Sequence, residues 1–422
     1  MDAMNVITKK RKRKGKAKAS TPEDAPPLPK LPDEIVVDQI LVRLPVKTLL
    51  RFRSVCKAWQ AIIANPVFIR AHLRSSASNS DQDPTFLITP ITFDSHIRFY
   101  QWQQGADDSN NGGVKKAAAA RLMHAKDLTA GDGEVSRFYS FSHCDGLVLV
   151  PTDTKFYLFN PATRDAITLP DSQREDLWHR GAKMVCHGGA CLGRDPRTGE
   201  YKVVRPFFRD VHAGGGNGGG GWRETRTHPP YPVVSSRWEA DPAGLHIKGF
   251  MYWRIDAEHH DSWVTPRGLL RLSLADERFR ETYLPESMAR RHPALGDVFE
   301  LAVLRGEELC LSQQTACSGD GWAVAVWTMK VDDDGRHGQW EQSYDIRCRY
   351  PCDPMALVDG GSRLLLRRGC VIYEHDLERP EDDDDDEVTT VCELDRIRSR
   401  IPHLQTTFRA DPNGEKFAGD GQ

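Results

Sequence analysis

Apolar residues recur at helical spacing near the N-terminus of this 422-residue chain. Between Ile35 and Leu44 they return at intervals that place them on one side of a helix, which predicts an amphipathic element. Pro32 suits the first turn of such a helix, and Pro45 ends it, because proline lacks the amide hydrogen that a helix interior requires. The pattern therefore predicts a first helix that stops before Pro45.

Two further apolar stripes follow this helix. One begins at Val46, and the next is preceded by Ser54, a favoured N-cap residue, and closed by Asn65-Pro66, since a residue before proline leaves the α region. A segment of roughly 40 residues cannot form a stable core without disulfides, a metal or a partner. It has a single cysteine, Cys56, and no cluster of metal ligands, so we expect a protein partner to cover its surplus apolar surface.

The pattern changes after Leu73. Residues 75–83 are rich in Ser, Asn, Asp and Gln, which predicts a linker. From about 85 to 377, short β-rich runs alternate with turn signals, as in a sandwich, barrel or propeller. Strand–turn–strand runs recur at 155–170, 193–205, 269–285 and 323–340, and a last unit starts at 371–377. This recurrence indicates stacked, blade-like β units.

Charge is unevenly distributed along the chain. The formal net charge of −3 argues against bulk nucleic-acid binding. The basic run 9–18 nevertheless predicts a nuclear import signal or a nucleic-acid arm, with a solvated tail as the alternative. The acidic run 381–387 is typical of a solvated, self-repelling loop.

Targeting signals and cysteine usage bear on the compartment. Residues 1–20 lack the apolar core of a secretory signal, and no apolar stretch approaches the ~20 residues of a transmembrane helix. Ten cysteines are scattered without framework spacing, which favours reduced thiols. We therefore expect a protein of the nucleus, the cytoplasm or both, with no membrane partner.

The sequence lacks the common motifs of catalysis and cofactor binding: it contains no His-Glu-x-x-His, P-loop or Gly-x-Ser-x-Gly. Cys348 and Cys352 lack a second pair at zinc spacing. The glycine run 214–221 includes a Gly-x-Gly-x-x-Gly spacing, but Pro229-Pro230 follows where a dinucleotide site needs a helix. We expect no catalytic residue, no metal and no cofactor.

Aromatic residues are concentrated in the β region, where most should pack in the core. Trp222 and Trp263 flank loop-like sequence, so we expect them to be exposed. Because aromatic residues dominate interface hot spots, both are candidate contacts for a bound target protein.

Residues 31–73 closely resemble the F-box, the module that docks onto the Skp-family adaptor of cullin-RING ubiquitin ligases. The resemblance is carried by Leu31-Pro32, Arg43-Leu44-Pro45, Val55-Cys56-Lys57-Ala58-Trp59 and the tail 66–73. It implies that the adaptor contact is formed or supported by Leu31, Pro32, Ile35, Val36, Leu44, Pro45, Val55, Cys56 and Trp59. For Trp59 and Ile62, internal packing is an equal alternative.

Residues 140–377 are similar to the F-box-associated region of plant F-box proteins. The similarity is carried by short motifs, among them Cys144-Asp-Gly-Leu147, Phe159-Asn-Pro-Ala-Thr163, Asp195-Pro196 with 201–204, Gly249-Phe-Met-Tyr-Trp253 and 301–311. One departure is Cys191-Leu-Gly-Arg194, where family members often have an aromatic or glycine-rich segment.

Together these observations predict a multidomain α+β chain, in which a small three-helix F-box precedes a large, all-β, irregular propeller-like (kelch-like) domain. A β-sandwich is the alternative. The expected boundaries are a disordered basic tail at 1–27, the F-box at 28–74, a linker at 75–84, the β domain at 85–401 with disordered loops near 105–120, 212–222 and 379–388, and a flexible tail at 402–422.

The resemblance implies a non-catalytic, substrate-recruiting subunit of an SCF-type (Skp–cullin–F-box) ubiquitin ligase. Its partners would be the Skp-family adaptor, through it the cullin-RING ligase, and an unknown target protein. An F-box protein whose β domain binds a glycan or small ligand, or which acts outside a ligase, is the alternative. A nucleic-acid-binding role would rest on residues 9–18 alone.

Overall fold

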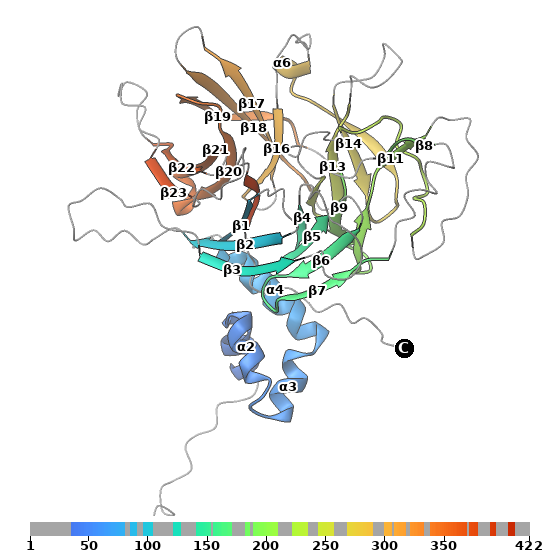
Figure 1. The fold of residues 1–422 in the computed structure, drawn as a ribbon, viewed down its shortest axis with the longest axis vertical. Helices are drawn as coiled ribbons and strands as arrows, with labels where there is room; N and C mark the ends of the chain where they lie inside the picture. The colour runs from blue at the N-terminus through green and yellow to red at the C-terminus, as the bar shows by residue number, and fades with distance from the viewer. Residues whose placement is uncertain are drawn as a thin grey trace, which may run out of the picture. The chain divides into compact units, whose positions relative to one another are not determined.

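The computed structural model describes the chain in segments, drawn in colour in Figure 1. These are residues 35–80, 85–90, 96–103, 121–127, 141–152, 155–170, 182–185, 189–209, 222–234, 244–256, 268–289, 299–305, 308–317, 321–332, 338–368, 371–378, 389–393 and 404–409. The chain divides into two units, Met1–Leu41 and Val42–Gln422. The runs 9–18 and 381–387, and the loops expected at 105–120 and 379–388, lie outside the described residues, as does 212–221.

The N-terminal described segment is helical. A π-helical turn η2 (Val36–Ile40) and a 3-10 turn η3 (Leu41–Arg43) come first, followed by α2 (Val46–Phe52), α3 (Lys57–Ile63) and α4 (Pro66–Ser80). Pro45 adopts an extended conformation at the N-cap of α2, so the expected break before Val46 is confirmed.

The start of α3 corrects one expectation. Cys56, not Ser54, is the N-cap, and its Sγ accepts a hydrogen bond from the Trp59 amide at 3.4 Å. The Ser54 hydroxyl instead donates to the Arg51 carbonyl at 2.6 Å, because Ser54 lies in the turn that closes α2.

The segment after Leu73 corrects a second expectation, that of a linker. Helix α4 begins at Pro66, a favoured first helical position, and continues to Ser80. The sequence placed a linker from Ser75 because that stretch is polar and lacks periodicity. A polar segment can extend a helix whose earlier turns are anchored, here by buried Phe68 and Leu73.

The rest of the described chain forms antiparallel sheets, five of four strands and two of two strands. The first contains β24 (Leu404–Arg409), β1 (Thr85–Pro90), β2 (His96–Gln103) and β3 (Arg121–Asp127). The next contains β4 (Ser142–Cys144), β5 (Leu147–Pro151), β6 (Phe156–Asn160) and β7 (Asp165–Thr168). Two pairs follow, β8 (Ala182–Val185) with β11 (Phe207–Arg209), and β9 (Cys191–Arg194) with β10 (Tyr201–Val204).

Three more four-stranded sheets complete the set. They are β12 (Leu245–Ile247), β13 (Phe250–Arg254), β14 (Gly268–Ser273) and β15 (Phe279–Tyr283); then β16 (Phe299–Leu304), β17 (Glu308–Ala316), β18 (Trp322–Lys330) and β19 (Glu341–Cys348); then β20 (Asp353–Val358), β21 (Arg363–Arg368), β22 (Val371–Asp376) and β23 (Thr389–Glu393). Short helices α6 (Glu286–Ala289) and η4 (Asp359–Gly361) lie in connections.

The second strand in most of these sheets is buried on both faces. In β5, Leu147 and Leu149 point into one apolar cluster while Val148 and Val150 point into another. Strand side chains alternate between faces, so a strand that reads as continuously apolar must lie between two other layers. The sheets of β1, β4, β9, β12, β16 and β20 are each packed between two neighbours.

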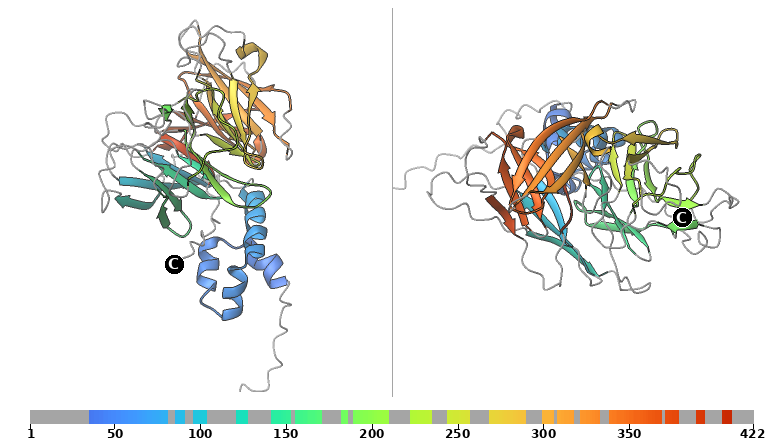
Figure 2. Two further views of the ribbon diagram at one scale, coloured as in Figure 1. Left: turned by 90° about the vertical axis from the view of Figure 1, so that its right-hand side faces the viewer. Right: turned by 90° about the horizontal axis from the view of Figure 1, so that it is seen from above.

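Six such clusters link the sheets into a closed ring (Figures 1 and 2). They join the sheet of β1 to that of β4, β4 to β9, β9 to β12, β12 to β16, β16 to β20, and β20 back to β1. A sandwich has two packed sheets, so the ring excludes that alternative and confirms the propeller-like prediction. The strand–turn–strand runs expected at 155–170, 193–205 and 269–285 form. Of the run expected at 323–340, β18 forms as its strand, and residues 333–337 lie outside the described residues.

The C-terminal segment departs from expectation. The sequence predicted a flexible tail from 402, but residues 404–409 form β24, which pairs antiparallel with β1. A strand from the end of the chain thus completes the sheet at its beginning. The polar sequence gave no periodic signal for this strand, because its stabilisation comes from long-range pairing.

Candidate protein-docking sites

The N-terminal helical segment exposes an unusual share of apolar side chains. Ile35 is 42% exposed, Ile40 41%, Val55 61% and Val67 64%. These are half of the exposed large hydrophobic residues in the described part of the chain, although the segment is a small fraction of it. Exposed apolar side chains concentrated in one segment of a chain are typical of segments that bind another protein.

The predicted adaptor-contact residues differ in burial. Ile35, Pro45, Val55 and Cys56 are exposed, whereas Val36, Leu44 and Trp59 are half-buried; Leu31 and Pro32 lie outside the described residues. The Trp59 ring packs at 5.1 Å from that of Phe52, so part of its surface serves internal packing between α2 and α3. Contact with an adaptor stays a prediction for each of them.

One residue of the tail has an internal role. The His72 ring on α4 lies 2.7 Å from the Leu44 carbonyl, and packs beside Phe68 with ring centroids 5.9 Å apart. Burial lowers the pKa of His72, and the hydrogen bond to Leu44 opposes that shift. A neutral His72 therefore ties α4 to the backbone just before α2. The resemblance to the F-box included His72 in the tail 66–73 but predicted no contact for it.

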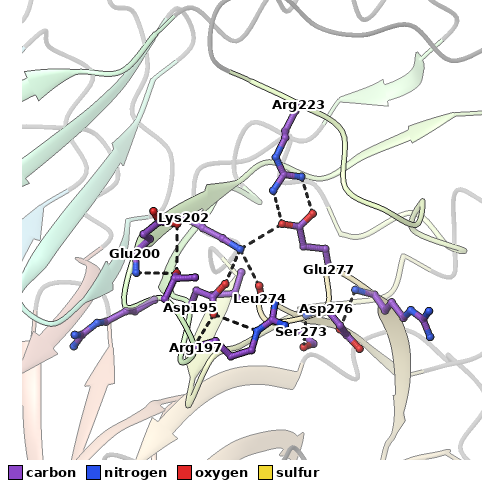
Figure 3. A network of polar contacts seen from close by, with 12 residues as sticks. Asp195, Arg197, Glu200, Lys202, Arg223, Ser273, Leu274, Asp276 and Glu277 are labelled. Atoms are coloured by element: carbon purple, nitrogen blue, oxygen red, sulfur yellow. Dashed lines mark hydrogen bonds and ion pairs between the residues drawn. The ribbon is translucent and has the colours of Figure 1, made fainter. Parts of the chain in front are cut away.

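A dense polar cluster of the β ring lies where the β9–β10 turn meets the β14–β15 turn (Figure 3). The Lys202 ammonium donates to Asp195 Oδ2 at 2.8 Å, to the Leu274 carbonyl at 2.9 Å and to Glu277 Oε1 at 3.3 Å. Arg223 forms a two-pronged ion pair with Glu277. We call this set of Asp195, Lys202, Arg223 and Glu277 the inter-sheet latch.

The electrostatics of the latch are those of a structural joint. The hydrogen bonds from Arg223, followed by those from Lys202, lower the pKa of Glu277 to about 2 against the opposing effect of burial. Burial also opposes ionisation of Asp195, yet hydrogen bonds from Lys202 and the Arg197 amide hold its pKa below the usual value. Both carboxylates stay ionised and paired, so neither is available as an acid or base at neutral pH.

Two tight turns place the family motifs beside this latch. Asp145 and Gly146, and likewise Lys248 and Gly249, all have positive φ, which is the requirement of a type I′ hairpin turn. A Cβ at Gly249 would lie 2.6 Å from Cδ of Pro196, which belongs to the β9–β10 turn. Only glycine therefore fits where the β12–β13 turn meets the β9–β10 turn. These motif residues therefore have a structural role, because they form the tight turns of the ring.

A half-buried histidine and two buried thiols lie beside the same hairpins. Burial lowers the pKa of His246 to about 4, and the ring accepts hydrogen bonds from the Arg194 and Gly249 amides. Burial raises the pKa of Cys144, and that of Cys191 to about 12. These thiols are protonated, which is the opposite of what a ubiquitin-transferring cysteine needs. Among the described residues, no cluster of His, Cys, Asp and Glu is arranged to hold a metal.

Of the two tryptophans predicted to contact a target protein, only Trp222 lies in the described part of the chain. Trp222 is half-buried: its Nε1 donates to the Pro170 carbonyl at 2.8 Å and its ring lies 5.7 Å from Phe156. The expectation of an exposed Trp222 is wrong, because the residue after the glycine run packs onto the β4–β7 sheet. Trp263 lies outside the described residues, and target binding by either stays a prediction.

None of the helices in the described segments is long and apolar enough to cross a bilayer.

Known proteins place this architecture in a family. The family described as "F-box associated beta propeller domain" matches residues 116–366, more than half of the chain, and "F-box domain" matches residues 28–70. The chain therefore belongs to the F-box proteins that carry an F-box-associated β-propeller domain, as the resemblance to plant F-box proteins implied.

Individual relatives agree with this assignment. "F-box protein At5g10340" of Arabidopsis thaliana is 25% identical over 342 residues, covering 75% of this chain and 69% of the relative. "F-box/kelch-repeat protein At2g43445" of the same plant is 23% identical over 324 residues, covering 74% and 66%. The N-terminal domain of Nup159, a solved structure, matches with a TM-score of 0.29 and 10% identity over 74% of this chain and 88% of that one, a likeness that supports no further argument.

Proposed function

We propose that this protein is the substrate-recognition subunit of an SCF-type ubiquitin ligase. In this role the N-terminal helices bind a Skp-family adaptor, which links the chain to a cullin-RING ligase. The β propeller holds a target protein for ubiquitination. The observation that carries the proposal is the exposed apolar side chains of a segment that matches the F-box.

The protein's contribution to catalysis would be positional. Holding a target close to a ubiquitin-charged enzyme supplied by other subunits turns a bimolecular encounter into a local one. This role requires a docking segment and a rigid display surface, and no reactive residue in the chain itself. We propose that it acts in the nucleus, the cytoplasm or both.

Binding of the full chain to a purified Skp-family adaptor tests the proposal. Val55→Asp places a charge on an exposed apolar side chain of the helical segment, and burying that charge in an interface should weaken binding by about tenfold or more. Ile167→Asp makes the same change at an exposed site on β7, where Ile167 is 45% exposed, and should leave affinity unchanged. Isothermal titration calorimetry measures both variants.

The outcomes separate clearly. A one-to-one complex that Val55→Asp weakens and Ile167→Asp does not would support the ligase-subunit role. No complex with the folded wild-type chain, or equal weakening by both variants, would contradict it.

A further inference from the structure

One edge of the propeller gathers exposed arginines around an exposed tyrosine. Tyr350, in the connection from β19 to β20, is 42% exposed. The Arg368 guanidinium lies over its ring at 3.6 Å from the centroid, and that of Arg349 lies over the ring at 5.6 Å. Arg347 is exposed two residues earlier in the chain. We call Arg347, Arg349, Tyr350 and Arg368 the Arg–Tyr patch.

The cations of this patch are not neutralised within the protein. In the described part of the chain, no carboxylate forms an ion pair with Arg347, Arg349 or Arg368. Of the nearest acidic residues in sequence, Asp345 forms no ion pair with these arginines, and Asp353 is already engaged by Arg367 at 3.1 Å and by the Gln314 side chain at 2.6 Å. By contrast, the exposed Arg223, Arg280 and Arg305 each have a carboxylate partner. The positive charge of the patch is thus left for an external ligand.

Hydrogen bonds fix the backbone around Tyr350. The Cys352 thiol donates to the Tyr350 carbonyl at 3.3 Å, and Gln314 Nε2 donates to the Cys352 carbonyl at 3.2 Å. Cys348 and Cys352 are both buried in the cluster that joins the sheets of β16 and β20. The connection is therefore anchored at both ends, and a ligand would meet a preorganised surface with little ordering cost.

The chemistry of the patch favours one class of ligand. Guanidinium groups pair with carboxylates in a two-pronged geometry, and stacking on an aromatic ring fixes the guanidinium plane without using its donors. Tyrosine and arginine are also the residues that dominate protein interface hot spots. A nucleic acid would need a longer basic track, and the chain's formal net charge is −3.

We propose that the Arg–Tyr patch recognises an acidic, Asp/Glu-rich peptide segment of the target protein. The proposal rests on the target-recruiting role of the propeller and specifies the chemistry of that recruitment. Arg349 and Arg368 would pair with carboxylates, and Tyr350 would provide the apolar contact between them. Arg347 would add a further positive charge two residues from Arg349.

Fluorescence anisotropy of a labelled oligo-glutamate peptide, titrated with the full chain at low salt, tests the inference. Wild type should bind, and Arg368→Glu and Tyr350→Ala should each weaken binding by about tenfold. Arg368→Lys keeps the charge and should retain more affinity than Arg368→Glu. The matched control is Arg278→Glu, a single charge reversal at an exposed arginine of the β14–β15 turn, which should change affinity less than about twofold.

Three results would overturn the inference. They are no binding by wild type, equal weakening by Arg278→Glu, and tighter binding of an oligothymidylate than of the peptide. The measurement uses no adaptor, so a failure here leaves adaptor docking untouched. A failure of adaptor docking would likewise leave the peptide result standing.

Discussion

The helical segment and the β ring treat their apolar residues in opposite ways. The helices are short and one-sided, and they leave Ile35, Ile40, Val55 and Val67 in contact with solvent. The ring buries apolar side chains on both faces of its inner strands, in six clusters that close on themselves. The ring therefore carries its own core, whereas the exposed apolar side chains of the helices are the surface that the proposed adaptor docking would cover.

Truncating an inter-sheet cluster should have the largest effect on stability. Phe159 is 3% exposed and stacks on Phe99 with ring centroids 4.4 Å apart, joining the sheet of β1 to that of β4. Phe159→Ala should lower the free energy of unfolding by about 3–5 kcal/mol. Tyr283→Ala, at a side chain 74% exposed, should change it by less than about 0.5 kcal/mol. Urea denaturation measures the free energy of unfolding of both variants. Equal losses would contradict the view that buried inter-sheet clusters, and not exposed side chains, stabilise the ring.

A glycine between two turns should have the next largest effect. Gly249→Ala introduces a left-handed alanine and a Cβ that meets the Pro196 ring, so we expect a loss of about 2 kcal/mol or more. Gly360 also has a positive φ of 70° but no atom within 4 Å of the added Cβ. Gly360→Ala therefore measures the backbone strain alone, about 1 kcal/mol. Similar losses in the two variants would show that the close approach to Pro196 is unimportant.

The inter-sheet latch should contribute a smaller, pH-dependent share. The pKa of Glu277 lies below its ordinary value of 4.5, at about 2, so the ionised pair stabilises the fold at neutral pH. That contribution is lost as the pH falls from about 4.5 to about 2. Glu277→Gln should cost about 1 kcal/mol at pH 7, since Arg223 is largely exposed and screened, and its deficit should vanish toward pH 2.

A control distinguishes the latch from general charge effects. Glu341→Gln removes an exposed carboxylate from β19 and should alter unfolding little across the same pH range. A Glu277→Gln deficit that stayed constant with pH would contradict the ion-pair account.

The smallest effect is expected in the helices. Cys56 caps α3 through its thiol, a weak acceptor, and serine is a stronger N-cap. Cys56→Ser should slow hydrogen exchange in Lys57–Ile63 by an amount equivalent to about 0.5 kcal/mol. Cys317→Ser, at an exposed cysteine that caps no helix, should leave exchange in these residues unchanged. Faster exchange in Cys56→Ser would show that the cap does not limit this helix.

Local signals in the sequence predicted much of this architecture. Pro45 and Pro66 mark real helix boundaries, and the Asp195-Pro196 motif lies at a real turn, because proline and side-chain hydrogen bonds act within a few residues. What escaped prediction depends on distant parts of the chain. The pairing of β24 with β1 and the placement of Trp222 on the β4–β7 sheet are set by long-range contacts that leave no periodic pattern.

The candidate sites likewise divide into features that local sequence predicts and features that depend on distant parts of the chain. The F-box motif predicted the adaptor-contact residues by order and spacing, yet only the structure separates exposed Val55 from half-buried Trp59. The Arg–Tyr patch has no sequence signature, because Arg368 reaches Tyr350 from a different strand.

Hydrogen exchange of the full chain, with and without a Skp-family adaptor, tests the central claim most directly. If the helices need a partner and the ring does not, the adaptor should slow exchange in residues 35–67 and leave the strands of the ring unchanged. Protection centred on the ring, or no protection in 35–67 at saturating adaptor, would contradict that account.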